Sequence, residues 1–226
     1  SRVAHRFMKE VMPYVDYGVD FHTGGSSRGN YPQIRCVLSE PKNQELSDAF
    51  AAPFTLNASY RQGSLRKEAA KLGKHILVYE TGEALRFDER GIKLGIEGTC
   101  RVMHHLGMVP DRPLEQEPQA IYYASRWVRA NAGGLLIADV ALGQRVRRDQ
   151  RLGIIVDPLR NTEEAIVSPL FGRVIGMARN QVVLPGFAAF HIGEETSAEQ
   201  ASDAAAAGLV DDEVEEDPDP GAGREP

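Results

Sequence analysis

Two short segments of the sequence place groups that can do chemistry at the ends of apolar strands. In the first, residues 19–24 (VDFHTG), the imidazole of His22 opens a glycine-rich loop, and Asp20 lies two residues before it. Side chains two apart in a strand share a face, so a carboxylate at Asp20 could orient a metal-ligating ring at His22. The alternative is a structural pair at a strand end, and the short Asp-x-His motif by itself favours that alternative.

The second segment is residues 79–82 (YETG), where Glu80 follows an apolar strand. Ligand sites of α/β proteins gather at the carboxyl ends of parallel strands. A carboxylate there could take a proton from a metal-bound water and pass it to a leaving group. A solvated glutamate at a strand end is the simpler interpretation of this segment alone. The two segments together, in this order, favour a shared site.

The elements that would position these groups follow from hydrophobic periodicity. Strands are predicted at 14–21, 34–38 and 75–79, and helices at 2–12, 44–51, 64–72 and 88–106. A glycine- and serine-rich loop is predicted at 23–31. The last helix carries an apolar stripe that we expect to be buried, formed by Ile92, Ile96, Cys100 and Met103. Strands and helices alternate, which predicts an α/β layered sheet.

The sequence after Pro110 predicts a second, all-β part. Its strands are predicted at 121–128, 134–140, 151–156, 165–167, 172–178 and 187–192. The predicted division is 1–112 for an α/β part, 113–195 for a β-rich part and 196–226 for a disordered acidic tail.

Composition excludes several classes of partner. From Glu194 onward twelve acidic residues accompany one basic residue, Arg224, so this segment has a net charge of −11. The whole chain has a net charge of −6, which leaves about +5 for the remainder. No Lys/Arg cluster with interleaved aromatics occurs, so we predict no nucleic-acid partner. No apolar run approaches the roughly 18 residues of a membrane span, which predicts no membrane partner. Cys36 and Cys100 match no metal spacing, and we predict a reduced, cytoplasmic compartment.

Three segments of the α/β part, in order, resemble one protein family. They are residues 14–24 (YVDYGVDFHTG), 63–82 (GSLRKEAAKLGKHILVYETG) and 88–108 (DERGIKLGIEGTCRVMHHLGM). They are similar to consecutive segments of the succinylglutamate desuccinylase/aspartoacylase family. The resemblance implies a three-layer, carboxypeptidase-like mixed sheet, present in part.

The β-rich part resembles the same proteins. The matching segments are 130–134 (ANAGG), 142–146 (LGQRV), 168–172 (SPLFG) and Pro185-Gly186. The implied fold is a small barrel-sandwich domain of biotinyl/lipoyl type. The sequence contains no lysine after Lys93, which excludes a swinging-arm carrier. We expect this part to pack on the catalytic part, where it would shape substrate access or support a homo-oligomer.

The resemblance also implies a function. The family consists of zinc-dependent deacylases, hydrolases that cleave an N-acyl amino acid or a related ester with a metal-activated water. One Zn²⁺ is bound by a Gly-x-His-Gly-x-Glu-like motif early in the chain and by the His of Asp-x-His, here His22. The general base is here Glu80, and Asp20 would hold the ligating ring. The implied partner is a small N-acyl amino acid-like substrate.

The sequence departs from the family in one large respect. Only 21 residues precede His22, and they contain neither Gly-x-His-Gly-x-Glu nor the family's Asn-Arg motif for the substrate carboxylate. Catalytic zinc uses three protein ligands and a water, so we expect the chain alone to be inactive. We interpret it as a fragment of an active enzyme. The alternative is a non-catalytic binding or structural protein that retains the fold.

Other polar residues are candidates for substrate contact. Tyr60, Arg61 and Arg66 precede Glu80, and an arginine there could clamp a substrate carboxylate with two hydrogen bonds. A solvated helix start explains both arginines equally well. Arg28 and Asn30, in the predicted glycine-rich loop, are further candidates. His191 and Glu194 have metal-ligand spacing but are interpreted as the end of the last strand.

Overall fold

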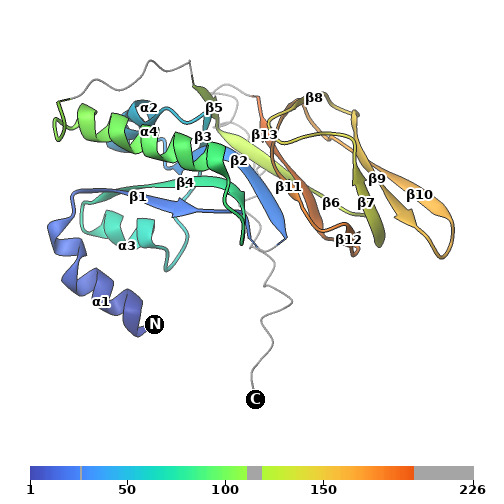
Figure 1. The fold of residues 1–226 in the computed structure, drawn as a ribbon, viewed down its shortest axis with the longest axis horizontal. Coiled ribbons are helices and arrows are strands. Elements are labelled where there is room, and N and C mark those ends of the chain that lie inside the picture. The colour runs from blue at the N-terminus through green and yellow to red at the C-terminus, as the bar shows by residue number, and fades with distance from the viewer. Residues whose placement is uncertain (26, 111–118, 196–226) are drawn as a thin grey trace.

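The computed structural model describes residues 1–25, 27–110 and 119–195. They form a mixed α/β sheet, which is followed by a separate four-stranded antiparallel sheet (Figure 1). The order of an α/β part and a β-rich part is therefore confirmed. The predicted linker at 111–118 and the predicted tail at 196–226 lie outside the described residues. None of the described helices is long and apolar enough to cross a membrane.

The elements of the first part agree with the predicted helices to within a few residues. The helices are α1 (Arg2–Glu10), α2 (Pro41–Phe50), α3 (Leu65–Lys71) and α4 (Glu89–His105), with a 3-10 turn η1 (Met12–Tyr14). The strands are β1 (Tyr17–His22), β2 (Arg28–Cys36), β3 (Phe54–Asn57) and β4 (His75–Glu83). One expectation is wrong, because residues 28–31 belong to β2 rather than to a loop. β3 was not predicted, because its residues carry no clear periodic signal.

The β-rich part has strands at all the predicted positions and in the predicted order, but the strand predicted at 121–128 is divided in two, and two further strands of two residues each were not predicted. The strands are β5 (Ala120–Tyr122), β6 (Ala124–Arg129), β7 (Gly134–Ala138), β8 (Arg145–Val146), β9 (Arg151–Asp157), β10 (Thr162–Val167), β11 (Gly172–Ala178), β12 (Val182–Val183) and β13 (Ala188–Glu194). Strands β10, β9, β7 and β12 form the separate sheet. The core of this part lies between the two sheets around Leu152, Val174 and Phe190, each fully buried.

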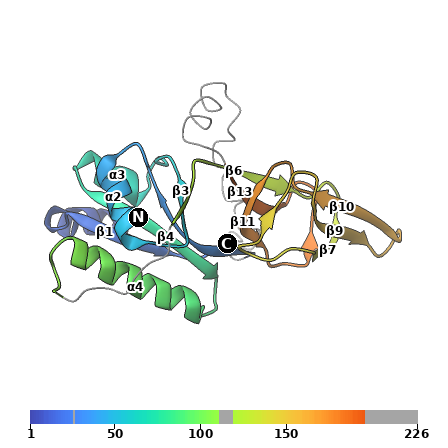
Figure 2. The same cartoon turned by 90° about the horizontal axis from the view of Figure 1, so that it is seen from above.

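The large sheet runs through both parts, in the order β1-β4-β2-β11-β13-β6. Strands β1 and β4 are parallel, and β2 is antiparallel to β4. The other edge of β2 is divided: residues 28–30 pair with β11, and residues 34–36 pair with β3. β2 thereby joins the two parts side by side (Figure 2). The predicted domain boundaries stay a prediction.

Helices cover both faces of the first part of the sheet (Figure 1). On one face α2 and α4 enclose a core that includes Ile34, Phe50 and Tyr79. On the other face α3 packs on β4 through Ala69 and Ile76. The hydroxyl of Ser64 caps α3 by accepting a hydrogen bond from the Lys67 amide at 3.2 Å, as a serine at a helix start is expected to do.

Glycines, not isoleucines, form the side of α4 that faces the sheet. The buried residues of this side include Gly91, Gly95 and Gly98. Ile92 is 46% exposed and Ile96 is 61% exposed, and Cys100 is exposed as well, so the predicted buried stripe is wrong. The physical reason is the close approach of the helix: a Cβ added at Gly98 would lie 2.5 Å from Cζ of Phe50. Periodicity locates the apolar face but not the face that touches the sheet.

This packing predicts that adding a side chain at a glycine of α4 destabilises the protein more than truncating one of its isoleucines. Gly98→Val should lower the free energy of unfolding by about 1–3 kcal/mol, because the added carbons overpack against the buried Phe50 ring. Ile96→Ala should change it by no more than about 0.5 kcal/mol, because that side chain is exposed. Urea unfolding followed by circular dichroism measures both. The opposite order would show that Ile96 faces the core.

Candidate functional site

The first site residues lie at the carboxyl end of β1. Nε2 of His22 is 3.1 Å from Oδ2 of Asp20, and the two side chains are 48% and 30% exposed. The pair lies on one face of the strand, as alternation requires. Because this contact uses Nε2, Nδ1 is the nitrogen that can bind a cation, and the carboxylate fixes the orientation of the ring.

Glu80 lies beside His22 on the neighbouring strand. The two residues are register partners in the parallel pair β1–β4. Register partners point to the same face, and neighbouring strands lie about 4.8 Å apart. The imidazole and the carboxylate therefore share one face of the sheet. Glu80 is 8% exposed, and β4 continues past it to Glu83, so it lies inside the strand rather than at its end.

Two side chains of β2 contact the Glu80 carboxylate. The Asn30 amide nitrogen donates a hydrogen bond to Oε2, and Nη1 of Arg35 lies 3.6 Å from Oε1. The Arg35 side chain is 14% exposed, so this ion pair is largely shielded from water. The carboxylate is thus held at both oxygens by groups of one strand.

A β-bulge in β2 makes this arrangement possible. Asn30 pairs with Gly82 and Gln33 pairs with Glu80, so two residues of β2, at 31 and 32, oppose the single residue 81 of β4. Residues three apart in a regular strand face opposite sides of a sheet, and the extra residue returns them to the same side. The bulge coincides with Pro32, which has no amide hydrogen to give to the ladder.

The same face continues into the β-rich part. Asn30 pairs with Gly176 of β11, Gly176 pairs with His191 of β13, and His191 pairs with Trp127 of β6. The His191 ring stacks on Trp127 with centroids 4.3 Å apart, and its Nε2 lies 2.8 Å from the Ser125 hydroxyl. A row of polar and aromatic side chains therefore runs across six strands, from His22 to Trp127.

His191 is kept neutral within this row. It is 4% exposed, and burial lowers the pKa of its imidazole well below the ordinary value of 6.5. The positive charges of Arg35 and Arg28 lower this pKa further. The Arg28 guanidinium lies over the Trp127 ring at 4.9 Å. The interpretation of His191 as a strand end is wrong in that it lies inside β13, because burial here is set by pairing with distant strands.

The other predicted substrate contacts lie in the loop before α3 and in the first turn of that helix. The Tyr60 hydroxyl donates to Glu40 at 2.9 Å and accepts from Asn43 at 3.3 Å. Asn43 in turn lies 3.1 Å from His75, the first residue of β4 and five residues before Glu80. These bonds place Tyr60 near the start of β4, whereas Glu80 lies roughly 16 Å further along the strand.

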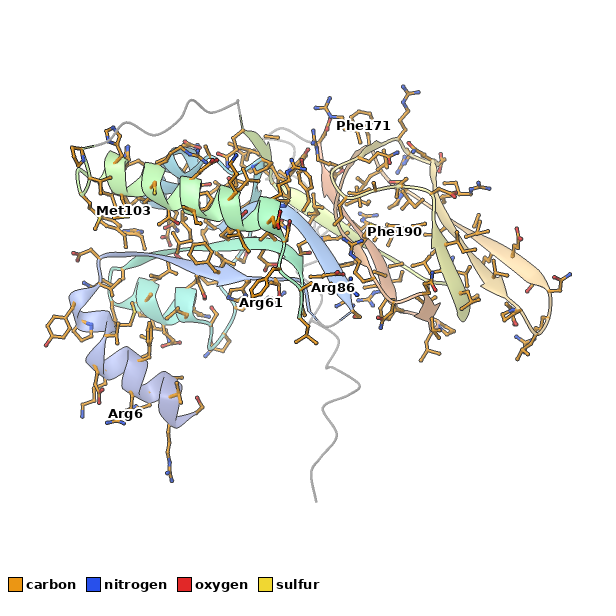
Figure 3. All side chains as sticks on the ribbon, viewed as in Figure 1. Arg6, Arg61, Arg86, Met103, Phe171 and Phe190 are labelled. Atoms are coloured by element: carbon orange, nitrogen blue, oxygen red, sulfur yellow. The ribbon has the colours of Figure 1, made fainter. Side chains whose placement is uncertain are left out.

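The two predicted arginines flank the start of α3. Arg66 is buried and donates to the carbonyl oxygens of Ala58 and Ser59 at 3.2 and 3.4 Å, which holds the loop before the helix. Arg61 is exposed in that loop, on the α3 side of the sheet (Figure 3). The substrate-contacting role of these residues stays a prediction.

The opposite face of β1 and β4 borders an apolar groove of about 480 Å³. Phe21 and Tyr79, which alternate with His22 and Glu80, form its floor, and α4 forms its wall through Ile92, Ile96 and Cys100. Phe21 is 57% exposed. The polar row and the apolar groove thus border the same two strands, and they meet at the end of β1, where His22 and Thr23 also line the groove.

The described residues contain no group of three or more His, Cys, Asp or Glu side chains that could hold a metal ion. A family model described as the succinylglutamate desuccinylase/aspartoacylase catalytic domain matches residues 1–106. Residues 1–106, just under half of the chain, are thus identified with the catalytic domain of the succinylglutamate desuccinylase/aspartoacylase family. A comparison with the curated proteins found no match.

Several solved structures share the fold of this chain. A protein from Rhodobacter sphaeroides is 21% identical, with a TM-score of 0.78 over 87% of this chain and 63% of its own. The ectoine utilization protein EutE of Ruegeria pomeroyi, solved with product bound, is 19% identical, with a TM-score of 0.76 over 85% and 62%. An aspartoacylase family protein of Mesorhizobium loti is 16% identical, with a TM-score of 0.73 over 87% and 68%. The chain spans about three fifths of the length of the first two.

Sequence reasoning missed Arg35 and Gly176, and it noted His191 only for its spacing from Glu194. Arg35 sits at a strand position that alternation alone treats as a surface site, and its partner Glu80 is 45 residues away. Pro32 inside a strand is a signal for the bulge that brings Asn30 to the face of Glu80, since proline within a strand marks a bulge or an edge. No local signal marks the pairing of Gly176 with Asn30, because the two residues belong to different parts of the chain.

The buried neutral His191 predicts a specific dependence of stability on pH. Above pH 6.5 the imidazole is neutral in both states. Below pH 6.5 the unfolded chain binds a proton that the folded chain excludes, so the free energy of unfolding falls by up to about 1.4 kcal/mol per pH unit. His191→Gln should remove this loss, measured by urea unfolding between pH 7.5 and 5. His5→Gln, on exposed α1, is the matched control. An unchanged slope in His191→Gln would contradict the burial.

Proposed function

We propose that this protein is part of a zinc-dependent deacylase that hydrolyses the amide bond of a small N-acyl amino acid-like substrate, or a related ester. The observation that carries the proposal is the register of β1 and β4, which sets His22 and Glu80 on one face of the sheet. Family membership of residues 1–106 supports the reaction class.

The residues present fit one part of a zinc site. His22 offers Nδ1 on an exposed ring that Asp20 holds from Nε2. Catalytic zinc uses three protein ligands, and we propose that the other two belong to the portion of the related structures that this chain does not span. When bound, zinc would lower the pKa of a water and polarise the acyl carbonyl. This chain alone is then expected to be catalytically inactive.

The residues of this chain divide the remaining work. Glu80 acts as general base, taking a proton from the attacking water and delivering it to the leaving amine. Asp20 keeps the ligating ring in one orientation. Tyr60, Arg61 and Arg66 stay candidates for substrate contact, and Arg61 is the one that solvent reaches most readily.

The β-rich part is proposed to have the barrel-sandwich fold of biotinyl/lipoyl type. Its large-sheet strands continue the polar row beyond Asn30, which supports a role in shaping access to Glu80. A homo-oligomeric assembly through this part is the second role that we propose for it.

The alternative is a non-catalytic protein that retains the fold, and the absence of a three-residue metal group among the described residues is the observation in its favour. The coding DNA upstream of the Ser1 codon discriminates between the two. An in-frame Gly-x-His-Gly-x-Glu supports the enzyme, and a start codon directly before Ser1 supports the alternative.

In the complete protein, Glu80→Gln should retain zinc and lose about 10²–10⁴-fold in kcat, because the proton acceptor is removed while the metal ligands stay. Elemental analysis and steady-state kinetics on N-acyl amino acids measure the two effects. Glu163→Gln, at an exposed position of β10, is the matched control. Near-normal turnover of Glu80→Gln would refute the assignment.

His22→Ala in the complete protein should lose bound zinc, because it removes one of the three ligands. Zinc content after dialysis against a weak chelator measures this directly. His5→Ala, on the exposed helix α1, should retain the zinc. Equal zinc content in the two variants would contradict the proposed ligand.

A further inference from the structure

We propose that Arg35 and Asn30 are positioning residues for Glu80, and that the β-rich part takes part in this by seating Asn30 against Gly176. The proposal rests on the proposed role of Glu80 as general base. It adds a device that lies partly outside residues 1–106, the portion that the family model matches.

Two side chains of β2 hold the Glu80 carboxylate, one at each oxygen. Asn30 donates to Oε2 and Arg35 approaches Oε1 at 3.6 Å, so rotation of the carboxylate would break one contact or the other. Glu80 is 8% exposed, and water competes weakly for these contacts. The attraction between the guanidinium and the carboxylate also opposes rotation of the Glu80 side chain away from β2.

The bulge at Pro32 brings a second side chain of β2 to the face of Glu80. Arg35 shares the face of Glu80 through ordinary alternation, since it pairs with Val78, two residues before Glu80. Asn30 shares that face because of the extra residue in β2. A regular strand would give the carboxylate one partner from β2, and the bulge gives it two.

Asn30 packs against Gly176 of β11, its register partner. A Cβ added at Gly176 would lie 3.0 Å from Oδ1 of Asn30 and 3.3 Å from Cβ of His191. Any side chain at this position would press on the amide that holds Glu80. The backbone of Gly176 therefore sets how far Asn30 can move away from the carboxylate. On the far side of Gly176, His191 is fixed by Ser125 and by the Trp127 ring.

The absence of charge on His191 favours the ion pair between Arg35 and Glu80. His191 is close enough to Arg35 for that guanidinium to lower the pKa of its imidazole. A neutral ring does not repel Arg35, whereas a protonated ring would compete with it for Glu80. Nε of Arg35 and Nδ1 of His191 find no hydrogen-bond partner among the described residues, so the ion pair with Glu80 orients the guanidinium.

A double-mutant cycle in the complete, zinc-loaded protein tests Arg35. Arg35→Met is expected to lower kcat about 10- to 100-fold with KM within about twofold, because the base is misplaced while substrate binding is retained. In a Glu80→Gln background the same substitution should cause no further loss, since Arg35 acts through Glu80. Losses that multiply independently would overturn the proposal.

Rescue by lysine separates a positioning role from a structural one. Arg35→Lys should recover most of the kcat that Arg35→Met loses, with KM within about twofold of the parent value, because it restores a cation beside the carboxylate. A purely structural defect would change kcat and KM together and would not respond to lysine, and either result would count against the proposal. Arg173→Met is the matched control, since Nε of this half-buried arginine of the same sheet donates to the Tyr122 hydroxyl at 3.1 Å.

Gly176→Ala tests the contribution of the β-rich part without removing any group. It should lower kcat about threefold to tenfold and add nothing to the loss in Asn30→Ala, because it acts by displacing Asn30. Gly133→Ala, where a Cβ would meet Pro185 at an ordinary 3.4 Å, is the matched control. If Arg35→Met does not fold, this variant carries the test, and full activity of Gly176→Ala defeats the proposal.

The result for Glu80→Gln distinguishes failure of the proposed function from failure of the proposed positioning residues. If Glu80→Gln turns over normally, the proposed function fails and Arg35 has no base to position. If Glu80→Gln is inactive while Arg35→Met and Gly176→Ala are normal, the function stands and the positioning device fails. Zinc content should equal that of the parent protein in all of these variants, because none replaces a proposed ligand.

Discussion

The register of three strands is the constraint on which the candidate site depends. A shift of one residue in β1, β4 or β2 would send its polar side chains to the face covered by α4. The apolar side chains of that face hold the register. Phe21 packs edge-on against Tyr79 with centroids 5.8 Å apart, and the Tyr79 hydroxyl donates to the Gly91 carbonyl at 2.8 Å. Ile34, the register partner of Tyr79, is fully buried. The core on one side thereby fixes the chemistry on the other.

The β-rich part is tied to this site by hydrogen-bonded strands rather than by a surface contact alone. β2 is the strand that both parts share, and it carries Asn30 where it meets β11 and Arg35 where it meets β3. Trp127 and His191 close the row from the other side, with the Arg28 guanidinium over the indole ring. A change in the packing of β11 or β13 therefore has a short structural route to the carboxylate of Glu80.

The sequence predicts those features of the site that depend on neighbours in the chain. Alternation along a strand is enough to pair Asp20 with His22, and an apolar run followed by a glycine is enough to single out Glu80. It fails where distant residues decide. The apolar stripe of α4 faces outward because glycines permit closer packing than any apolar side chain, and a hydrophobicity pattern gives glycine no weight. Arg35 meets Glu80 from 45 positions away, and His191 meets Ser125 and Trp127 from 66 and 64 positions away, which no local pattern contains.

The exposed side of α4 and the outer strand β1 bear on how the molecule behaves in solution. Among the described residues β1 ends the large sheet, so its outer backbone groups have no neighbouring strand. Phe21, Ile92 and Ile96 present apolar surface directly beside that edge. An open strand edge next to an apolar patch is a template for aggregation. Unless something covers this region, preparations of these residues will tend to form inclusion bodies and soluble oligomers, and detergent or a fused solubility partner becomes part of any practical purification.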